Sequence, residues 1–490
     1  MTHERQEPPP VSDGAVVPGP ALPRGTLARA TFWTLGGEAA SHTVRVLSSL
    51  ILTRLLFPDD FGLMALVQGF LLGLKMFSDL GIWSIIIRHE RGDEPRFLNT
   101  VWTVSVLRGA LLGLAACAIA WPVAAFYDLP KLAYILPAAG LTLLLDGFLS
   151  TKFFLYDRRL SKARPMLINL ASSISALVFM VAWAWMFRSV WALVWGGVVG
   201  TLVRVLLSHL ALPGPGNRFQ WDGAAWREVA QFGKWVFFNS AVTFLALQLD
   251  RFLFAKLIPL WMLGVYSIAL NILQLPTTAV GAVATGVALP AFSRSQNHPS
   301  ELSAMFDRMR LLILLGGGAC ISFLIFNGPW LMALLYDPRY EDAGWILQVA
   351  ALGGWFLVLE ASHGAMLLTL GQPRWLTLAS ASKIAAMAVV VPPAFLVFDF
   401  PGALVAISAV EGVRYFLESR QVRKAGLGDR RPERAVSLVM LGGAALAMLI
   451  QHGPWMPAGP VLRAVLCFTA FLAVWLPIGL WYLGKLRRTA

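Results

Sequence analysis

Long apolar runs separated by short polar breaks fill the chain from residue 31 to residue 484. A helix that crosses a bilayer needs about 20 mostly apolar residues, and nearly all of these runs reach that length. The pattern predicts an all-α integral membrane protein of about fourteen transmembrane helices. They are expected at residues 31–56, 61–88, 97–121, 131–155, 164–187, 190–212, 228–257, 261–292, 302–327, 343–370, 375–398, 401–419, 435–452 and 460–484.

A weak internal repeat divides these helices into two groups. The break after the first run, Phe57-Pro58-Asp59-Asp60, ends a helix because proline disfavours helix at the residue before it and carboxylates prefer water. The stretch from Arg54 to Gly62 recurs loosely from Arg251 to Gly264, with arginine, proline and glycine in the same order. Two six-helix halves followed by two further helices are therefore predicted. Repeated halves are the usual build of a transporter, with the substrate site where they meet.

The repeat and the polar breaks predict five parts. A proline-rich polar tail at 1–30 is expected to be disordered and cytoplasmic, and residues 213–227 to form a cytoplasmic linker. The N-terminal bundle is expected at 31–212 and the C-terminal bundle at 228–424, and together they should form a V-shaped central cavity. Residues 425–490 are expected to hold the two additional helices and a short basic tail.

Composition and charge agree with a membrane protein. Of the 490 residues, 57% are hydrophobic and 14% are charged, whereas soluble domains carry about 25% charged residues. The net charge of +13 does not indicate a nucleic-acid partner, because Lys and Arg lie in the breaks rather than in one patch. Breaks assigned to the inside hold about four times as many Lys and Arg as the others, which predicts that both termini are cytoplasmic. No cleavable signal peptide is expected, because the first apolar run has full spanning length.

No catalytic, metal or cofactor motif stands out. Cys117, Cys320 and Cys467 lie singly in predicted helices, without metal-ligand spacing. The sequence holds no P-loop, H-E-x-x-H motif or serine nucleophile elbow, and no break exceeds roughly fifteen residues. We therefore predict no enzyme, and an ion gradient or the membrane potential would have to drive any transport.

Charged side chains inside the apolar runs are the main clue to function. Each costs at least about 2.5–3.5 kcal/mol at the bilayer centre, so such groups usually face a bundle interior or a watery cavity. Five basic residues are candidates for a cationic lumen that binds an anionic substrate: Arg45, Lys75, Arg108, Arg251 and Lys383. Six others are candidates for ion coupling or charge balance: Glu38, His42, Asp79, Glu360, His363 and Glu411.

Spacing and chemistry support the assignment, and simpler readings stay open. Glu38, His42 and Arg45 share one face of the first helix at i, i+4 and i+7. Arginine suits phosphate, since its planar guanidinium makes two parallel charge-assisted hydrogen bonds. Alternatively, Arg251 lies near a helix end and reaches the interface, Lys75 and Asp79 neutralise each other at i, i+4, and both histidines are hydrogen-bonded packing residues.

Three motifs carry a family resemblance over residues 31–484. They are Leu52-Thr53-Arg54-Leu55-Leu56-Phe57-Pro58-Asp59-Asp60-Phe61-Gly62, Phe77-Ser78-Asp79-Leu80-Gly81-Ile82, and Phe232-Gly233-Lys234-Trp235 with Gln248-Leu249-Asp250-Arg251. With these residues the chain resembles the polysaccharide-transporter branch of the multidrug/oligosaccharidyl-lipid/polysaccharide (MOP) exporter superfamily. The resemblance is to Wzx-type oligosaccharide-unit flippases, in particular their colanic-acid-like members.

The resemblance implies alternating access by two bundles in a bacterial inner membrane. It implies that undecaprenyl-diphosphate-linked oligosaccharide units are flipped for exopolysaccharide, capsule or O-antigen synthesis. The partners it implies are this polyprenyl-diphosphate-linked oligosaccharide, membrane lipid, Na+ or H+, a polysaccharide polymerase and a chain-length regulator. Two alternatives in the same superfamily are a lipid II flippase and a drug/cation antiporter, the latter disfavoured because a positive lumen repels cationic drugs.

Overall fold

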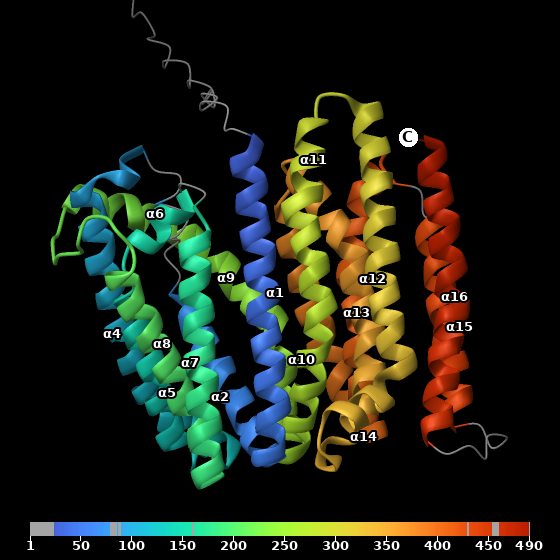
Figure 1. The fold of residues 1–490 in the computed structure, drawn as a ribbon, viewed down its shortest axis with the longest axis horizontal. Coiled ribbons are helices and arrows are strands. Elements are labelled where there is room, and N and C mark those ends of the chain that lie inside the picture. Colours follow the sequence, from blue (N-terminus) through green and yellow to red (C-terminus); the bar gives the residue numbers. More distant parts are fainter. Residues whose placement is uncertain are drawn as a thin grey trace, which may run out of the picture.

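The computed structural model describes residues 24–78, 86, 90–158, 161–428, 431–452 and 460–489. All regular secondary structure in these residues is helical, and the all-α prediction is confirmed. The first half forms one lobe, drawn on the left of Figure 1, together with α1 beside it. Its helices are α1 (Arg24–Leu55), α2 (Pro58–Phe77), α4 (Pro95–Tyr127), α5 (Leu132–Gly147), α6 (Lys152–Arg158), α7 (Ala163–Phe187) and α8 (Trp191–Leu210), with a 3-10 turn η1 (Glu90–Asp93).

The second half forms the other lobe, and two further helices lie beyond it. The lobe consists of α9 (Gly223–Leu257), α10 (Leu260–Val283), a π-helical turn η2 (Ala284–Ala288), α11 (Leu289–Arg294), α12 (Pro299–Leu335), a 3-10 turn η3 (Pro338–Tyr340), α13 (Ala343–Thr369) and α14 (Arg374–Lys424). The additional helices are α15 (Arg431–His452) and α16 (Pro460–Thr489).

The predicted fourteen spans are confirmed. Nine described helices are each long and apolar enough to cross a membrane, and α5 with α6, bent by 61°, makes a tenth. The 51 residues of α14 would measure about 75 Å if straight, more than twice a hydrocarbon core. Asp399 divides α14 into two spans with its non-helical backbone (φ 56°, ψ −154°). The remaining spans are α1, α9 and α16.

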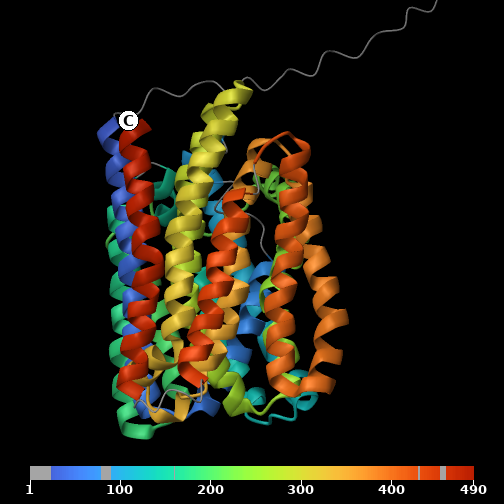
Figure 2. The ribbon, with the colours of Figure 1, turned by 90° about the vertical axis from the view of Figure 1, so that its right-hand side faces the viewer.

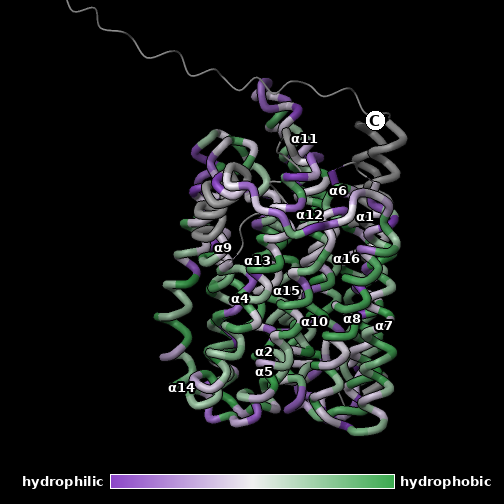
Figure 3. Tube along the Cα trace, turned by 90° about the vertical axis from the view of Figure 1, so that its left-hand side faces the viewer, coloured by the Kyte–Doolittle hydropathy of each residue, from purple (hydrophilic) through white to green (hydrophobic). Residues whose placement is uncertain are grey.

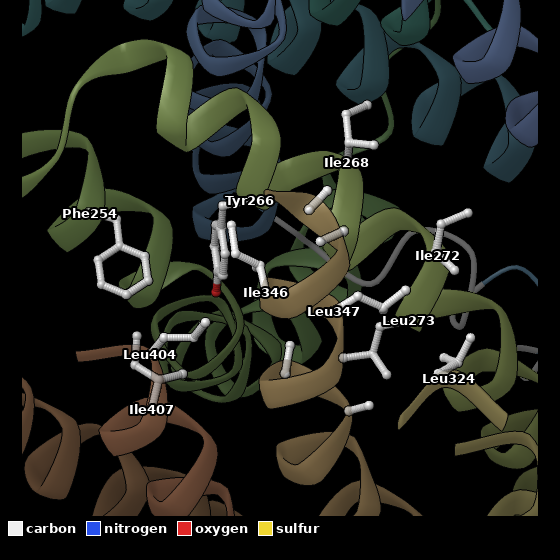
Figure 4. Close-up of a cluster of buried hydrophobic side chains, with 14 of the residues drawn as sticks. Phe254, Tyr266, Ile268, Ile272, Leu273, Leu324, Ile346, Leu347, Leu404 and Ile407 are labelled. Atoms are coloured by element: carbon white, nitrogen blue, oxygen red, sulfur yellow. The ribbon is translucent and has the colours of Figure 1, made fainter. Parts of the chain in front are cut away.

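Outer surfaces are apolar, as lipid contact requires. In Figure 3 hydrophobic positions fill the middle of the helices, and hydrophilic ones gather mainly towards their ends. Large apolar side chains such as Trp121 and Leu396 are more than 70% exposed, although they belong to the chain's apolar runs. The inside of the second lobe is a conventional packed core, where Phe254, Tyr266, Ile346 and Leu404 bring α9, α10, α13 and α14 together (Figure 4).

The lobes meet where α2 begins against the beginning of α10. A β-carbon built on Gly62 would overlap the carbonyl oxygen of Leu260, and one built on Gly264 would overlap that of Pro58. Only glycine permits such close backbone approach. Helix α1 stands between the lobes, with α7 on one side and α10 on the other (Figure 1).

Helices α15 and α16 pack along α12, as Figure 2 shows at the front of the molecule. Polar contacts fix α15 to α13 along its length. Trp355 Nε1 donates to Ser437 Oγ (3.0 Å), and Gln348 Nε2 donates to Gln451 Oε1 (2.9 Å). These helices therefore sit on the flank of the second lobe and not between the two lobes.

Candidate functional site

A cavity of about 480 Å³ lies between the two lobes. Helices α1, α2, α7 and α8 line it from one side, and α9 and α10 from the other. We call it the central cavity. Its charged lining residues include Arg45 from α1 and Arg251 from α9, so each lobe contributes one guanidinium group.

Arg45 lies on the exposed face of α1 in this cavity. Its Nη2 is 3.1 Å from Nδ1 and 3.2 Å from Nε2 of His42, one helical turn earlier. Arg45 forms no ion pair with any carboxylate whose side chain the structure describes. The side chain of Glu38, predicted on the same face, lies outside the described residues.

Arg251 is half-buried on α9, and it too forms no ion pair with a carboxylate in the described part of the chain. Its Nη1 donates to Gln248 Oε1 at 3.4 Å, while its Nε is buried with no hydrogen-bond partner in the described part of the chain. The adjacent Asp250 does not compensate it by an ion pair, because Asp250 accepts a hydrogen bond from the Tyr266 hydroxyl instead (2.6 Å). A buried donor without an acceptor carries a desolvation cost that a bound anion would remove.

Uncharged polar groups complete the central cavity. Gln68 of α2 and Asn271 and Gln274 of α10 add amides, and Ser48, Ser49 and Ser267 add hydroxyls. Amides and hydroxyls both donate and accept hydrogen bonds, as sugar hydroxyls do. Gln68 was not among the residues predicted from the sequence, although a helix-face analysis of α2 could have found it.

Lys75 and Arg108 line a different cavity, of about 220 Å³, inside the first lobe. Lys75 Nζ lies 2.5 Å from Asp146 Oδ2, and Arg204 Nη1 lies 3.5 Å from Asp146 Oδ1. Arg108 donates from Nε to Ser78 Oγ (3.0 Å) and from Nη2 to the Lys75 carbonyl (2.8 Å). Asp79, expected to pair with Lys75, lies outside the described residues.

Asp146 was missed from the sequence. It lies one residue before the end of α5, where a polar residue is unremarkable, and only packing brings it to Lys75 of α2.

Lys383 and Glu411 line a third cavity, of about 220 Å³, inside the second lobe. Lys383 Nζ is 2.5 Å from Glu411 Oε1. Arg414 bridges Glu360 (3.1 Å) and Glu418 (3.3 Å). Three carboxylates thus face two cations in a buried cluster, which we call the carboxylate cluster: Glu360, Glu411, Glu418, Lys383 and Arg414.

The carboxylate cluster has unmet hydrogen-bonding capacity. The Oε2 atoms of Glu360, Glu411 and Glu418 are all buried with no partner in the described residues. Arg251 and Gln274 line both this cavity and the central cavity, so the two adjoin. Glu418 was missed because it falls at the end of the predicted span 401–419, where a charge is expected.

His363 lines none of these three cavities. Its Nε2 is 3.2 Å from Glu433 Oε1, and Glu433 also accepts from the Tyr415 hydroxyl (2.7 Å) and from Arg310 (3.4 Å). All four side chains are buried, and they join α12, α13 and α14 to the start of α15. The position of His363 agrees with the open alternative of a packing residue.

The proposed lumen residues are thus distributed rather than gathered. Of the five basic candidates, Arg45 and Arg251 share the central cavity, Lys75 and Arg108 share the cavity of the first lobe, and Lys383 lies in that of the second.

Comparison with known proteins identifies the family. Residues 51–345 match the family described as "Polysaccharide biosynthesis protein". The chain is 26% identical over 294 residues to the amylovoran biosynthesis protein AmsL of Erwinia amylovora, covering 58% of this chain and 74% of AmsL. It is 22% identical to the lipopolysaccharide biosynthesis protein WzxC of Escherichia coli strain K12, covering 65% of each chain. It is also 22% identical to the succinoglycan biosynthesis transport protein ExoT of Rhizobium meliloti, covering 58% of this chain and 57% of ExoT.

Solved structures show the same fold. The inward closed conformation of the lipid II flippase MurJ superposes with a TM-score of 0.73 at 12% identity, covering 94% of this chain and 99% of MurJ. An inward-facing multidrug transporter of the MATE family superposes with a TM-score of 0.62 at 11% identity, covering 78% of this chain and 94% of that one. The chain therefore belongs to the polysaccharide biosynthesis protein family and has the fold of the MOP exporter superfamily.

Proposed function

We propose that the protein flips a polyprenyl-diphosphate-linked oligosaccharide across the bacterial inner membrane, with the diphosphate held between Arg45 and Arg251. The observation that carries this proposal is one guanidinium from each lobe in one cavity, without a described carboxylate paired to either. In a low-dielectric cavity two such charges favour an anion strongly. The names of the relatives, which refer to amylovoran, lipopolysaccharide and succinoglycan, support a saccharide cargo.

Contact with both lobes would let the cargo drive the conformational cycle. A ligand shifts an equilibrium only by its difference in affinity between the two states. An anion held by α1 and α9 together binds best when the lobes bring both arginines close, and it loses one of them when the lobes separate. The amides of Gln68, Asn271 and Gln274 would bind the sugar next to the diphosphate.

The carboxylate cluster is our candidate for ion coupling. Its three carboxylates and two cations leave one negative charge in excess if all are ionised. A buried uncompensated charge is expensive, so the cluster would hold one proton or one Na+. Arg251 lines both cavities. An anion bound in the central cavity would neutralise the positive charge of Arg251, and the carboxylate cluster would then bind its proton or Na+ more tightly.

Lipid II is the second candidate cargo. Its flippase MurJ shares the fold, and a diphosphate-linked saccharide would meet the same arginines. A cationic drug is not supported, since Arg45 and Arg251 would repel it.

The test is transport by the purified protein in proteoliposomes. An undecaprenyl-diphosphate oligosaccharide and lipid II are supplied separately, and translocated glycan is detected with an added glycosidase or lectin. We expect transport of the oligosaccharide, and a 10- to 100-fold loss in Arg45→Ala and Arg251→Ala, because a charge-assisted hydrogen bond contributes about 1.5–3 kcal/mol.

Arg218→Ala is the matched control, because Arg218 is exposed in the loop before α9 and lines none of the three cavities. Full transport by Arg45→Ala would refute the site. Transport of lipid II alone would reassign the cargo.

A further inference from the structure

The same dipeptide, Tyr-Asp, ends the third helix of each half. Tyr127 is the last residue of α4 and Asp128 its C-cap, and Tyr336 and Asp337 directly follow α12. Each pair begins the loop to the next helix, and each reaches across to the first helix of the opposite lobe.

The first loop crosses from the first lobe to α9. The Tyr127 hydroxyl donates to the Phe252 carbonyl at 3.4 Å. Lys256 Nζ donates to Asp128 Oδ2 (2.9 Å) and to the Phe126 carbonyl (2.7 Å), and it lies 5.4 Å from the centre of the Phe126 ring.

The second loop crosses from the second lobe to α1. The Tyr336 hydroxyl and Ser49 Oγ are 3.2 Å apart. Arg339 Nε donates to Asp337 Oδ1 (2.8 Å), and its Nη2 donates to the carbonyl of Thr53 (3.2 Å) near the end of α1. Its guanidinium also lies 5.0 Å from the centre of the Phe57 ring. Last-turn carbonyls have no partner within a helix, so a cation is well suited to them.

The two loops make similar but not identical contacts. In each, tyrosine contacts the first helix of the opposing lobe, and a cation paired with the aspartate binds a carbonyl and an aromatic ring across the boundary between the lobes. In the first loop the cation, Lys256, belongs to the opposing helix, whereas in the second the cation, Arg339, belongs to the loop itself. The crossing of Gly62 and Gly264 lies between the same helix ends, and it is reciprocal too. Such mutual contacts characterise an interface built by symmetry.

We propose that the Tyr127-Asp128 and Tyr336-Asp337 loops are paired latches that hold the lobes together at this end of the molecule, and that both release when the central cavity opens there. The inference rests on the proposed transport cycle only in assuming that the lobes separate.

The chemistry of the latches suits repeated release. The contacts are hydrogen bonds, ion pairs and cation–ring contacts rather than a packed apolar surface, and Lys256 and Asp128 are about half and four-fifths exposed. Exposed pairs are individually weak and break without burying a charge. The hydrogen bonds from Arg339 lower the pKa of Asp337, so this carboxylate stays ionised through the physiological range.

The test is the distance between the lobes, measured by spin-label spectroscopy without any cargo. Labels are placed at Tyr134→Cys on α5 and Trp330→Cys on α12, both exposed, after Cys117, Cys320 and Cys467 are replaced by alanine. Lys256→Met and Arg339→Met keep the aliphatic stems and remove the charges. Each substitution is expected to raise the fraction of molecules with a long distance between the labels roughly two- to fivefold. The double variant should raise this fraction by about the product of the two single effects.

Asp342→Asn is the matched control, because the Asp342 carboxylate accepts from nearby Trp345 Nε1 (3.3 Å) and forms no hydrogen bond or ion pair to the other lobe within the described part of the chain. Its distances should equal those of the parent. A second double variant, Tyr127→Phe with Tyr336→Phe, removes only the two hydroxyl groups and should increase the long-distance fraction less. Unchanged distances in both double variants, with the proteins folded, would overturn the proposal. Because no cargo is present, that outcome would leave the transport proposal untouched.

Discussion

Gly62 and Gly264 face each other with no space for a side chain. A β-carbon on Gly62 would lie 3.1 Å from the backbone nitrogen of Gly264, and one on Gly264 would lie 3.0 Å from that of Gly62. The two glycines belong to the internal repeat, and each follows a proline at the start of the second helix of its half, Pro58 in α2 and the N-cap Pro259 of α10. The two copies of the sequence repeat therefore contact each other at these glycines.

Substitution of either glycine should separate the lobes at this crossing. Gly62→Ala and Gly264→Ala place a methyl group against backbone that cannot turn aside, so we expect thermal unfolding to show a loss of about 1–3 kcal/mol. Gly316→Ala in α12 is the control, since nothing lies within 4 Å of its added β-carbon. That change should be neutral or slightly stabilising. Equal behaviour of the three variants would contradict the tight crossing.

The ion pair of Lys75 and Asp146 should stabilise the first lobe. Asp146→Asn leaves Lys75 and Arg204 facing each other without their shared carboxylate. Because Lys75 is half exposed, solvent screens much of the repulsion, and a loss of about 1–2 kcal/mol is expected. The measurement is thermal unfolding of Asp146→Asn and the parent at low and at high salt. The difference in stability between the two proteins should be smaller at high salt. A stability equal to the parent at low salt would show that the pair contributes nothing.

Removing a negative charge and removing a positive charge from the carboxylate cluster should have different effects on thermal stability. Glu360→Gln removes the excess negative charge and should leave thermal stability unchanged or higher. Lys383→Met leaves Glu411 without its cation and should lower stability by about 3–5 kcal/mol. Glu360→Gln should also lose the dependence of transport on an ion gradient. If both variants lower stability equally, the cluster holds no excess charge.

The buried group around Glu433 should hold α15 in place. Glu433→Ala removes the acceptor of Arg310, His363 and Tyr415, so three buried donors lose a partner. We expect faster hydrogen exchange in α15 and α16, with little change in α2 or α4. Ser437→Ala, which removes a single bond to Trp355, provides a graded comparison. Uniform exchange throughout the molecule would instead indicate global destabilisation.

The positions of single residues show how far sequence reasoning reached into the site. Arg45 was placed in a cavity between the halves because it stands in the middle of an apolar run, and α1 carries it there. Lys383 was proposed for the same lumen, yet it pairs with Glu411 inside one lobe. Both residues show the same local signal, a cation surrounded by apolar neighbours. Their surroundings differ because different helices pack against the faces that carry them.

The sequence by itself determined the membrane class, the fourteen spans and their two related halves, because these follow from the length and period of apolar runs, which are local properties of the chain. It also marked the charges that lipid would not accept. The tertiary structure alone decided which of those charges meet. Lys75 and Asp146 are 71 residues apart and Arg339 and Thr53 are 286 apart, and their pairing depends on how whole helices pack. Helical periodicity specifies the face on which a side chain lies but not the helix that this face will contact.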